Sequence, residues 1–420
     1  MNELHRTYAP ILRFARGERF YPMRVEDMLQ YSSLCAKGQD KPLLRQGEVT
    51  PDQLARHKHD PAVFLRSVEA GPLRAEEVVS NWGQQTLDLV YQWAHQTTSS
   101  WTESLARRAY SWFSPKTMGA TQLFWWNGLI APLLATRHSP PATRHSPSSE
   151  DLPRLILPEE TRDDAAERYT FRLGRMPENA YYYRQVRDGP YLCLQYWFFY
   201  SFNDWARGFG GMNDHEGDWE GMLLFFQLDG RRQAYGRPPT KLVSQPPAHV
   251  TFVGHHSRLT KPWEHQDVER VGTHPVGYVA AGSHATYPER KPYPIMERYG
   301  LVDHATGDGV TIDHDQWVHR IDLDSVPWLT DYLGSWGTRF WLPLERARAI
   351  LGALAVLSVA KDLSPALGIA ASAAPGEIEL PGVSAPHGPR FGDTGDQRPQ
   401  WMGPAAWAGL SATEVATTDL

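Results

Sequence analysis

The densest group of side chains that could do chemistry lies in the run Asn213-Asp214-His215-Glu216-Gly217-Asp218-Trp219-Glu220. Because side chains of a strand alternate between its faces, Asp218 and Glu220 share one side and can meet at one point. Strict alternation places His215 on the opposite side, but Gly217 permits a sharp bend or a bulge that could bring it round. Two carboxylates and an imidazole are costly to bury together unless they share a cation or a proton. The motif therefore predicts a divalent-metal site; the alternative is a solvated acidic face preceded by a turn histidine.

More histidine and acid occurs in the same middle third of the chain. Asn203 and Asp204 follow a strand-like apolar run at 191–200, and His274 and His284 flank a second run. Neutral imidazole is a common metal ligand, yet it serves equally well as a hydrogen-bonding group at a sheet edge. Together these side chains mark a polar site on an otherwise aromatic scaffold.

The chain resembles the vacuolar protein sorting-associated protein 62 family in six blocks, in the order of that family. The blocks are 8–14 with 18–22, then 194–200, 215–220, 274–285, 334–337, and 387–390 with Trp401. They cover about half of the chain. The biochemical activity of that family is poorly defined, so the resemblance implies a fold rather than a function.

A more distant similarity is to the necrosis-inducing (NLP-type) cytolysins of plant pathogens, which carry a Gly-His-Arg-His-Asp-Trp-Glu heptapeptide. Aligned on Asp218-Trp219-Glu220, the chain keeps the first histidine as His215 and has Gly217 in place of the second. In that family the first histidine, the aspartate and the glutamate coordinate a divalent metal with an upstream aspartate. The metal assists binding to membrane sphingolipid head groups. The resemblance therefore implies metal ligands at His215, Asp218 and Glu220, with Asp204 as the upstream acid.

Composition excludes some classes of function. The net charge of −6 and the pI near 6.3 argue against a general nucleic-acid binder, for which a basic stripe is expected. The chain has two cysteines, Cys35 and Cys193, and the second lies inside an apolar run. A disulfide framework is therefore not expected, and a reducing compartment fits.

Membrane and export signals are weak in this sequence. Residues 1–6 lack a basic region followed by an apolar one, so no signal peptide is predicted and a cytoplasmic location is expected. The apolar stretches 123–134 and 349–360 are shorter than the ~20 residues that a spanning helix needs. The first, rich in tryptophan, could contact a membrane interface, so a peripheral association is the alternative.

We predict a mainly β fold, an antiparallel β-sandwich with helical insertions. Its expected divisions are an opening strand (1–28), a helical insertion (29–135), a flexible linker (136–165) with a duplicated Ala-Thr-Arg-His-Ser-Pro segment, a sandwich core (166–345), an Ala-rich helical insertion (346–380) and a return to the sandwich (381–420). The strands of the core are expected at 191–200, 218–228, 249–254, 276–281 and 317–323.

Three functions fit these observations. The first is a metal-assisted module that binds a polar head group of a lipid or glycan, with His274, His284 and Trp219 as binding residues beside the metal. Oxygen-dominated ligands with one imidazole favour Mg²⁺, Mn²⁺ or Ca²⁺ over structural zinc. The second is a metal-dependent hydrolase in which Glu216, Glu220 or a histidine acts as general base. The third is a scaffold whose acidic cluster is structural.

Overall fold

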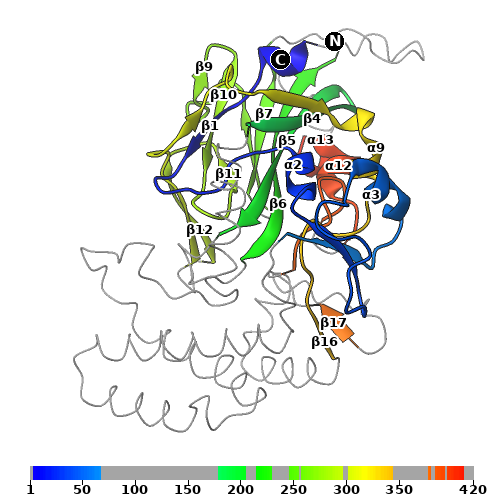
Figure 1. The fold of residues 1–420 in the computed structure, drawn as a ribbon. Helices are drawn as coiled ribbons and strands as arrows, with labels where there is room; N and C mark the ends of the chain where they lie inside the picture. The colour runs from blue at the N-terminus through cyan, green and yellow to red at the C-terminus, as the bar shows by residue number, and fades with distance from the viewer. Residues whose placement is uncertain are drawn as a thin grey trace, which may run out of the picture.

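The structure, a computed structural model, describes residues 3–67, 178–204, 214–228, 246–254, 257–296, 301–343, 377–379, 384–392 and 395–410. These residues build a mainly β molecule, as predicted (Figure 1). The linker at 136–165, most of the two predicted insertions and the last ten residues lie outside the described residues.

A six-stranded sheet forms the centre of the described chain. Its order is β15 (His319–Asp322), β4 (Ala180–Asp188), β5 (Tyr191–Asn203), β6 (His215–Gln227), β7 (His249–Gly254) and β8 (Ser257–Pro262). All neighbours are antiparallel except β15 and β4, which run parallel. Each of the two long central strands has 13 residues.

A second sheet packs against one face of the first. It contains β11 (Thr286–Tyr287), β10 (His274–Val279), β1 (Ile11–Phe14) and β14 (Thr311–Ile312), with β9 (Arg270–Val271) paired to β10. Leu12, Phe14 and Val279 from this sheet share one buried cluster with Phe198 and Leu224 of the central sheet. This apolar layer between two sheets is the core of a β-sandwich.

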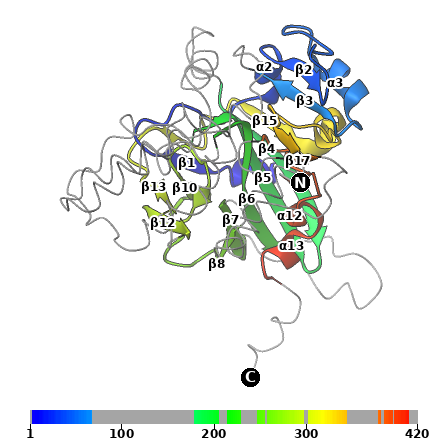
Figure 2. The same cartoon turned by 90° about the horizontal axis from the view of Figure 1, so that it is seen from below.

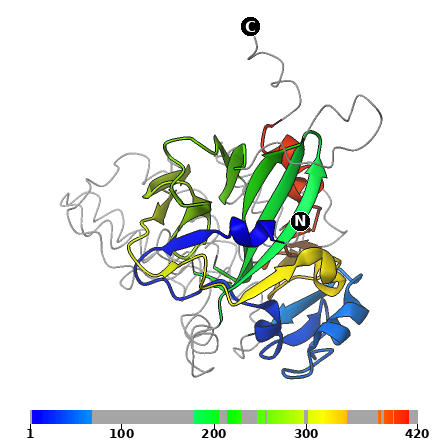
Figure 3. The ribbon, with the colours of Figure 1, turned by 90° about the horizontal axis from the view of Figure 1, so that it is seen from above.

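The opposite face of the central sheet is also covered. Figure 2 and Figure 3 show α2 (Val25–Leu29), β2 (Ser33–Ala36), β3 (Val63–Arg66) and α3 (Pro51–His57) together on the side away from β1 and β10. Their side chains join Trp197, Phe199 and Trp219 in a second buried cluster. Because both faces are buried, β5 reads as a continuous apolar run instead of an alternating one.

Short elements complete the described fold. They are α1 (Leu4–Thr7), the hairpin β12 (Lys291–Met296) and β13 (Leu301–Ala305), η4 (Leu323–Ser325), α9 (Pro327–Thr330), the pair β16 (Trp341–Pro343) and β17 (Glu377–Glu379), α12 (Pro399–Met402) and α13 (Pro404–Trp407). Helix α13 packs on the end of β5 and β6 that lies near Tyr191 and Phe225, and Trp401 of α12 packs against Trp197 on the covered face.

The five predicted core strands are confirmed within a few residues. The first part of the predicted helical insertion differs, since residues 29–67 contain α3 and also the antiparallel pair β2–β3. The alternating Leu34 and Ala36 bury against the core, and Leu34 is fully buried, so tertiary packing stabilises a short strand there. Cys35 and Cys193 are both buried and form no disulfide. No helix in the described part of the chain is long and apolar enough to cross a membrane.

Candidate cation site at the end of β5 and β6

The central strands change character at one end. Most of β5 and β6 is aromatic or aliphatic, but the last cross-strand pair is Asn203 with His215. Asp204 and Asp214 follow directly beyond this pair, and all four residues are less than 9% exposed. A polar cluster is therefore buried at the end of an apolar sheet.

Gly217 decides which side chains meet there. Its φ is +66°, while the one-to-one register continues on both sides, with Tyr200 opposite Asp218 and Phe202 opposite Glu216. Tyr200 packs in the layer between the sheets and Phe202 packs on the other face, so both strands switch faces at this point. A left-handed glycine achieves this without the inserted residue of a bulge.

The face switch brings His215 beside Asp218, as the sequence predicted. His215 Nε2 lies 3.9 Å from Asp218 Oδ1, and the side chains are 10% and 9% exposed. The same switch turns Glu216 to the opposite side. A Cβ on Gly217 would lie 2.4 Å from the carbonyl oxygen of Trp336, so the neighbouring segment also requires glycine here.

Glu216 is a structural carboxylate. Its Oε1 accepts hydrogen bonds from the backbone nitrogen and the hydroxyl of Ser67, at 2.9 and 2.7 Å. Its Oε2 accepts from the backbone nitrogen and the hydroxyl of Thr338, at 2.8 and 2.7 Å. A carboxylate held by four donors at 3% exposure is not available as a general base, which corrects that part of the hydrolase hypothesis.

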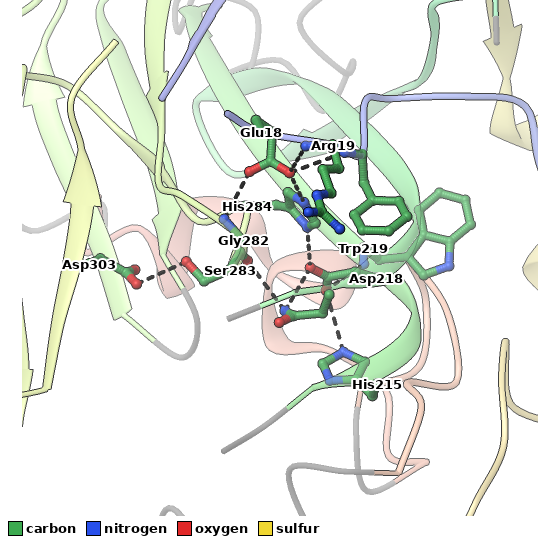
Figure 4. Close-up of polar contacts among 11 residues, drawn as sticks. Glu18, Arg19, His215, Asp218, Trp219, Gly282, Ser283, His284 and Asp303 are labelled. Carbon is green, nitrogen blue, oxygen red and sulfur yellow. Dashed lines mark hydrogen bonds and ion pairs between the residues drawn. The ribbon is translucent and has the colours of Figure 1, made fainter. Parts of the chain in front are cut away.

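Asp218 belongs to a chain of alternating carboxylates and imidazoles. Its Oδ2 lies 3.0 Å from His284 Nδ1, and the other ring nitrogen of His284 lies 3.6 Å from Glu18 Oε1. Figure 4 shows Glu18 and Asp218 on opposite sides of His284, with His215 beyond Asp218. The His284 ring stacks on Tyr200 at 3.9 Å between centroids and 3° between planes.

Mutual stabilisation sets the charges of this chain. Burial alone would lower the pKa of His284, but its hydrogen bond with Asp218 and its charge interactions with Asp218 and Glu18 outweigh burial and raise the pKa to about 9. Burial would raise the pKa of Glu18, yet His284 and the backbone N–H groups of Gly282 and Phe20 lower it to about 2. The pKa of Asp218 is also lowered, because His215 and His284 outweigh its burial. At neutral pH the centre is carboxylate–imidazolium–carboxylate.

The turn after β10 holds several side chains of the cluster in place through its backbone groups. The backbone nitrogen of Gly282 donates to Glu18 Oε2 at 2.8 Å, and its carbonyl accepts from Asp204 N at 2.9 Å. Asn203 Nδ2 donates to Asp218 Oδ2 at 3.1 Å and to the carbonyl of Ser283 at 3.5 Å. Asn203 Oδ1 has no hydrogen-bond partner among the described residues, although the residue is 2% exposed. A buried amide oxygen is thus left open beside Asp218.

The predicted ligand set is only partly assembled. His215 and Asp218 are neighbours, and Asp204 adjoins them through Asn203 and Gly282. Glu220 lies on the same strand, but its carboxylate oxygens, the ring nitrogens of His215 and the carboxylate oxygens of Asp218 do not all lie within 4.8 Å of one another. Within the described ranges, the group of three such donors that meets this distance is instead Asp313, His314 and Asp315, which is partly exposed.

Two predicted binding residues lie elsewhere. His274 is at the start of β10, where its Nδ1 lies 2.8 Å from the Ala9 carbonyl and its ring stacks on His314. His284 follows the other end of that strand, so the two histidines that flank it cannot share one site. Trp219 is 2% exposed and packs against Phe199 and Trp336 on the covered face of the sheet. His284 joins the site, whereas His274 and Trp219 do not.

Sequence reasoning missed the role of Glu18. This residue lies 266 positions before His284 and has no spacing relation to the central motif. It reaches the site because β1 pairs in parallel with β10, which brings the segments that follow both strands to the same edge. No local pattern in the sequence could have identified it.

Comparisons with known proteins give a distant likeness. No family model and no curated protein matches the chain. One similar solved structure is Necrosis and Ethylene inducing Protein 2 from the causal agent of cocoa's Witches Broom disease, with 14% identity, a TM-score of 0.23, and coverage of 37% of this chain and 55% of that chain. Another is the non-toxic HaNLP3 protein, with 12% identity, a TM-score of 0.24, and coverage of 38% and 58%.

The described chain therefore shares a partial and distant structural similarity with NLP-type proteins, and it spans a little over half of their length. None of these matches supports the expected resemblance to the vacuolar protein sorting-associated protein 62 family. At this level of similarity the proposed function rests on the geometry of the site.

Proposed function

We propose that the protein is a divalent-cation-dependent binding module for a polar head group of a lipid or glycan, with His215 and Asp218 as cation ligands. The carrying observation is the 3.9 Å separation of His215 Nε2 and Asp218 Oδ1 at the polar end of β6. This distance is too long for a good hydrogen bond. It is within the span of two ligands that each lie about 2.3–2.6 Å from one Ca²⁺ ion.

Nearby oxygens support the same proposal. Asn203 Oδ1 is buried beside Asp218 with no hydrogen-bond partner in the described part of the chain, and an amide oxygen is a normal ligand for Ca²⁺. Asp204 and Asp214 follow the Asn203–His215 pair and add two more buried carboxylates. Ca²⁺ fits such an oxygen-rich set best, and Mg²⁺ and Mn²⁺ are the other candidates.

Electrostatics also favours a cation. The imidazolium of His284 is shared between Glu18 and Asp218, so this part of the centre carries one positive and two negative charges. Buried charge in excess is costly unless it is paired or coordinates a metal. A divalent ion at His215 would offset the surplus and still keep coordination positions directed outward.

The coordination positions of the ion that protein side chains leave unfilled would determine which class of molecule the module binds. Phosphate oxygens and sugar hydroxyls are hard oxygen donors that can complete the shell of such an ion. A lipid or glycan head group would therefore bind through the ion. The proposal includes a peripheral association with membranes. It also includes a reducing compartment such as the cytoplasm, which the two buried thiols support. Kinship with the vacuolar protein sorting-associated protein 62 family is the third part, and the six sequence blocks support it.

The test is co-sedimentation with liposomes and retention on immobilised glycans, each with Ca²⁺ and with chelator. The expected result is binding that needs the ion and is lost in Asp218→Asn, while circular dichroism shows that the chain remains folded. Absence of ion-dependent binding to every lipid and glycan would reject the head-group function. Metal-dependent ester hydrolysis, lost in Glu220→Gln, would favour the hydrolase, and a melting temperature that rises with the ion without either activity would favour the scaffold.

A further inference from the structure

We infer that His284 is a positioning residue of the cation site, which fixes Asp218 so that one defined oxygen faces the ion. The inference rests on the proposed function. His284 lies behind Asp218, on the side away from His215, and would not touch the ion itself (Figure 4).

The carboxylate of Asp218 is held on both oxygens in an ordered way. His284 Nδ1 and Asn203 Nδ2 both contact Oδ2, at 3.0 and 3.1 Å. Trp219 N donates to Oδ1 at 2.9 Å, and that oxygen is the one that faces His215. With Oδ2 occupied by two donors, Asp218 is limited to binding an ion through Oδ1 alone. His284 therefore imposes single-oxygen coordination.

His284 is itself fixed from several directions. The residue is fully buried, its ring stacks on Tyr200, and its other nitrogen faces Glu18. Its φ of +58° is the one positive value at a non-glycine residue among the described residues. Such a conformation costs free energy and persists only where the surroundings over-determine it, which is frequent at functional sites. The strained turn therefore presents the imidazole to Asp218 in one orientation.

Two amide variants separate positioning from general support. In His284→Asn the amide nitrogen takes the place of Nδ1 and can still donate to Asp218, and asparagine tolerates a positive φ. In His284→Gln the amide lies one carbon further out, toward Glu18, so the bond to Asp218 is lost. His5→Gln is the matched control: His5 is also buried and stacks on a tyrosine, Tyr183, at 3.8 Å and 8°, and its ring hydrogen-bonds with Tyr181, away from Asp218 and His284.

The experiment is a titration of the full chain with Tb³⁺, an oxygen-seeking luminescent ion that substitutes for Ca²⁺. Emission gives the affinity, and the lifetimes in H₂O and D₂O give the number of bound waters. We expect His284→Gln to bind about 10- to 100-fold more weakly than wild type, the usual effect of losing a group that orients a ligand. Its bound-water number should change, since Asp218 can then turn. His284→Asn and His5→Gln should keep the wild-type affinity within about threefold and the wild-type water number.

Equal affinities and water numbers in wild type and His284→Gln would overturn the inference while leaving the proposed function intact. An equal loss in His284→Asn and His284→Gln would overturn it as well, because it would indicate general support of the fold. Failure of the wild-type chain to bind Tb³⁺ or Ca²⁺ would overturn both. If His284→Gln does not fold, His284→Gly replaces it, because glycine adopts the required φ and removes the donor; the same outcomes apply.

Discussion

Glu216 and Asp218 are two carboxylates on one strand, separated by a single glycine, yet they face opposite ways and have different kinds of partner. Both are nearly buried, at 3% and 7% exposure. Glu216 accepts hydrogen bonds from the backbone N–H groups and the hydroxyls of Ser67 and Thr338, which do not titrate near neutral pH. Asp218 faces two imidazoles and a side-chain amide.

The difference shows that burial of a carboxylate does not define its role. Glu216 joins the segment after β3 to the segment before β16, and its hydrogen bonds satisfy two buried donors of Ser67 and two part-buried donors of Thr338. Asp218 instead belongs to a charged chain that ends at His215, whose side chain is 10% exposed. We therefore expect substitutions at Glu216 to act on stability, and substitutions at Asp218 to act on cation binding.

Replacement of Glu216 by alanine should have the largest effect on stability. It leaves two buried donors of Ser67 and two part-buried donors of Thr338 without their acceptor, so we expect a loss of roughly 3–5 kcal/mol in the free energy of unfolding. Urea denaturation followed by tryptophan fluorescence measures it. Asp324→Ala, which removes a mostly exposed carboxylate paired with Arg184, is the control and should cost less than about 1 kcal/mol. Similar losses in the free energy of unfolding in both variants would show that the hydrogen bonds of Glu216 do not stabilise the fold.

The charged chain around Asp218 should make stability depend on pH in a defined window. The pKa of His284 is raised from 6.5 to about 9, so its contribution is fully present below pH 6.5 and is lost as pH rises through 9. The pKa of Glu18 is lowered from 4.5 to about 2, so its contribution is present above pH 4.5 and is lost as pH falls toward 2.

Between pH 6.5 and 9.5 we therefore expect a loss of roughly 3 kcal/mol from the His284 shift. Melting temperatures measured across this range should fall in the wild-type chain and change less in His284→Asn, which cannot titrate there. Parallel curves for the two proteins would mean that His284 is not the titrating group.

Gly217 separates the two carboxylates, and its substitution should affect both. Gly217→Ala combines a positive φ with a Cβ 2.4 Å from the Trp336 carbonyl, and we expect a destabilisation of about 2 kcal/mol or more. Gly189→Ala is the matched control, since its φ is +55° but no atom lies within 4 Å of an added Cβ. Thermal unfolding should show the larger loss at Gly217. Equal losses would mean that close packing against Trp336 contributes nothing.

The meeting of His215 with Asp218 could be predicted from the sequence, because Gly217 permits the bend that brings them to one side. The structural role of Glu216 could not, since Ser67 and Thr338 reach it from distant segments. The placement of Trp219 could not, because the face opposite Asp218 is covered by α2, β2 and β3 and is not a binding surface. His274 and His284 lie close to each other in the sequence, but they are at opposite ends of β10 and are therefore far apart in space. Glu18 depends on the parallel pairing of β1 with β10, which no local signal encodes.

The most direct test of the account is calorimetric titration with Ca²⁺ of the wild-type chain and of two matched variants, Asp218→Asn and Glu216→Gln. Both substitutions replace a buried carboxylate with an amide of the same shape, two residues apart on β6. We predict that Asp218→Asn weakens binding by about tenfold or more and that Glu216→Gln stays within about threefold of wild type, since only Asp218 faces His215. Equal losses in the two variants, or no binding by the wild-type chain, would contradict the account.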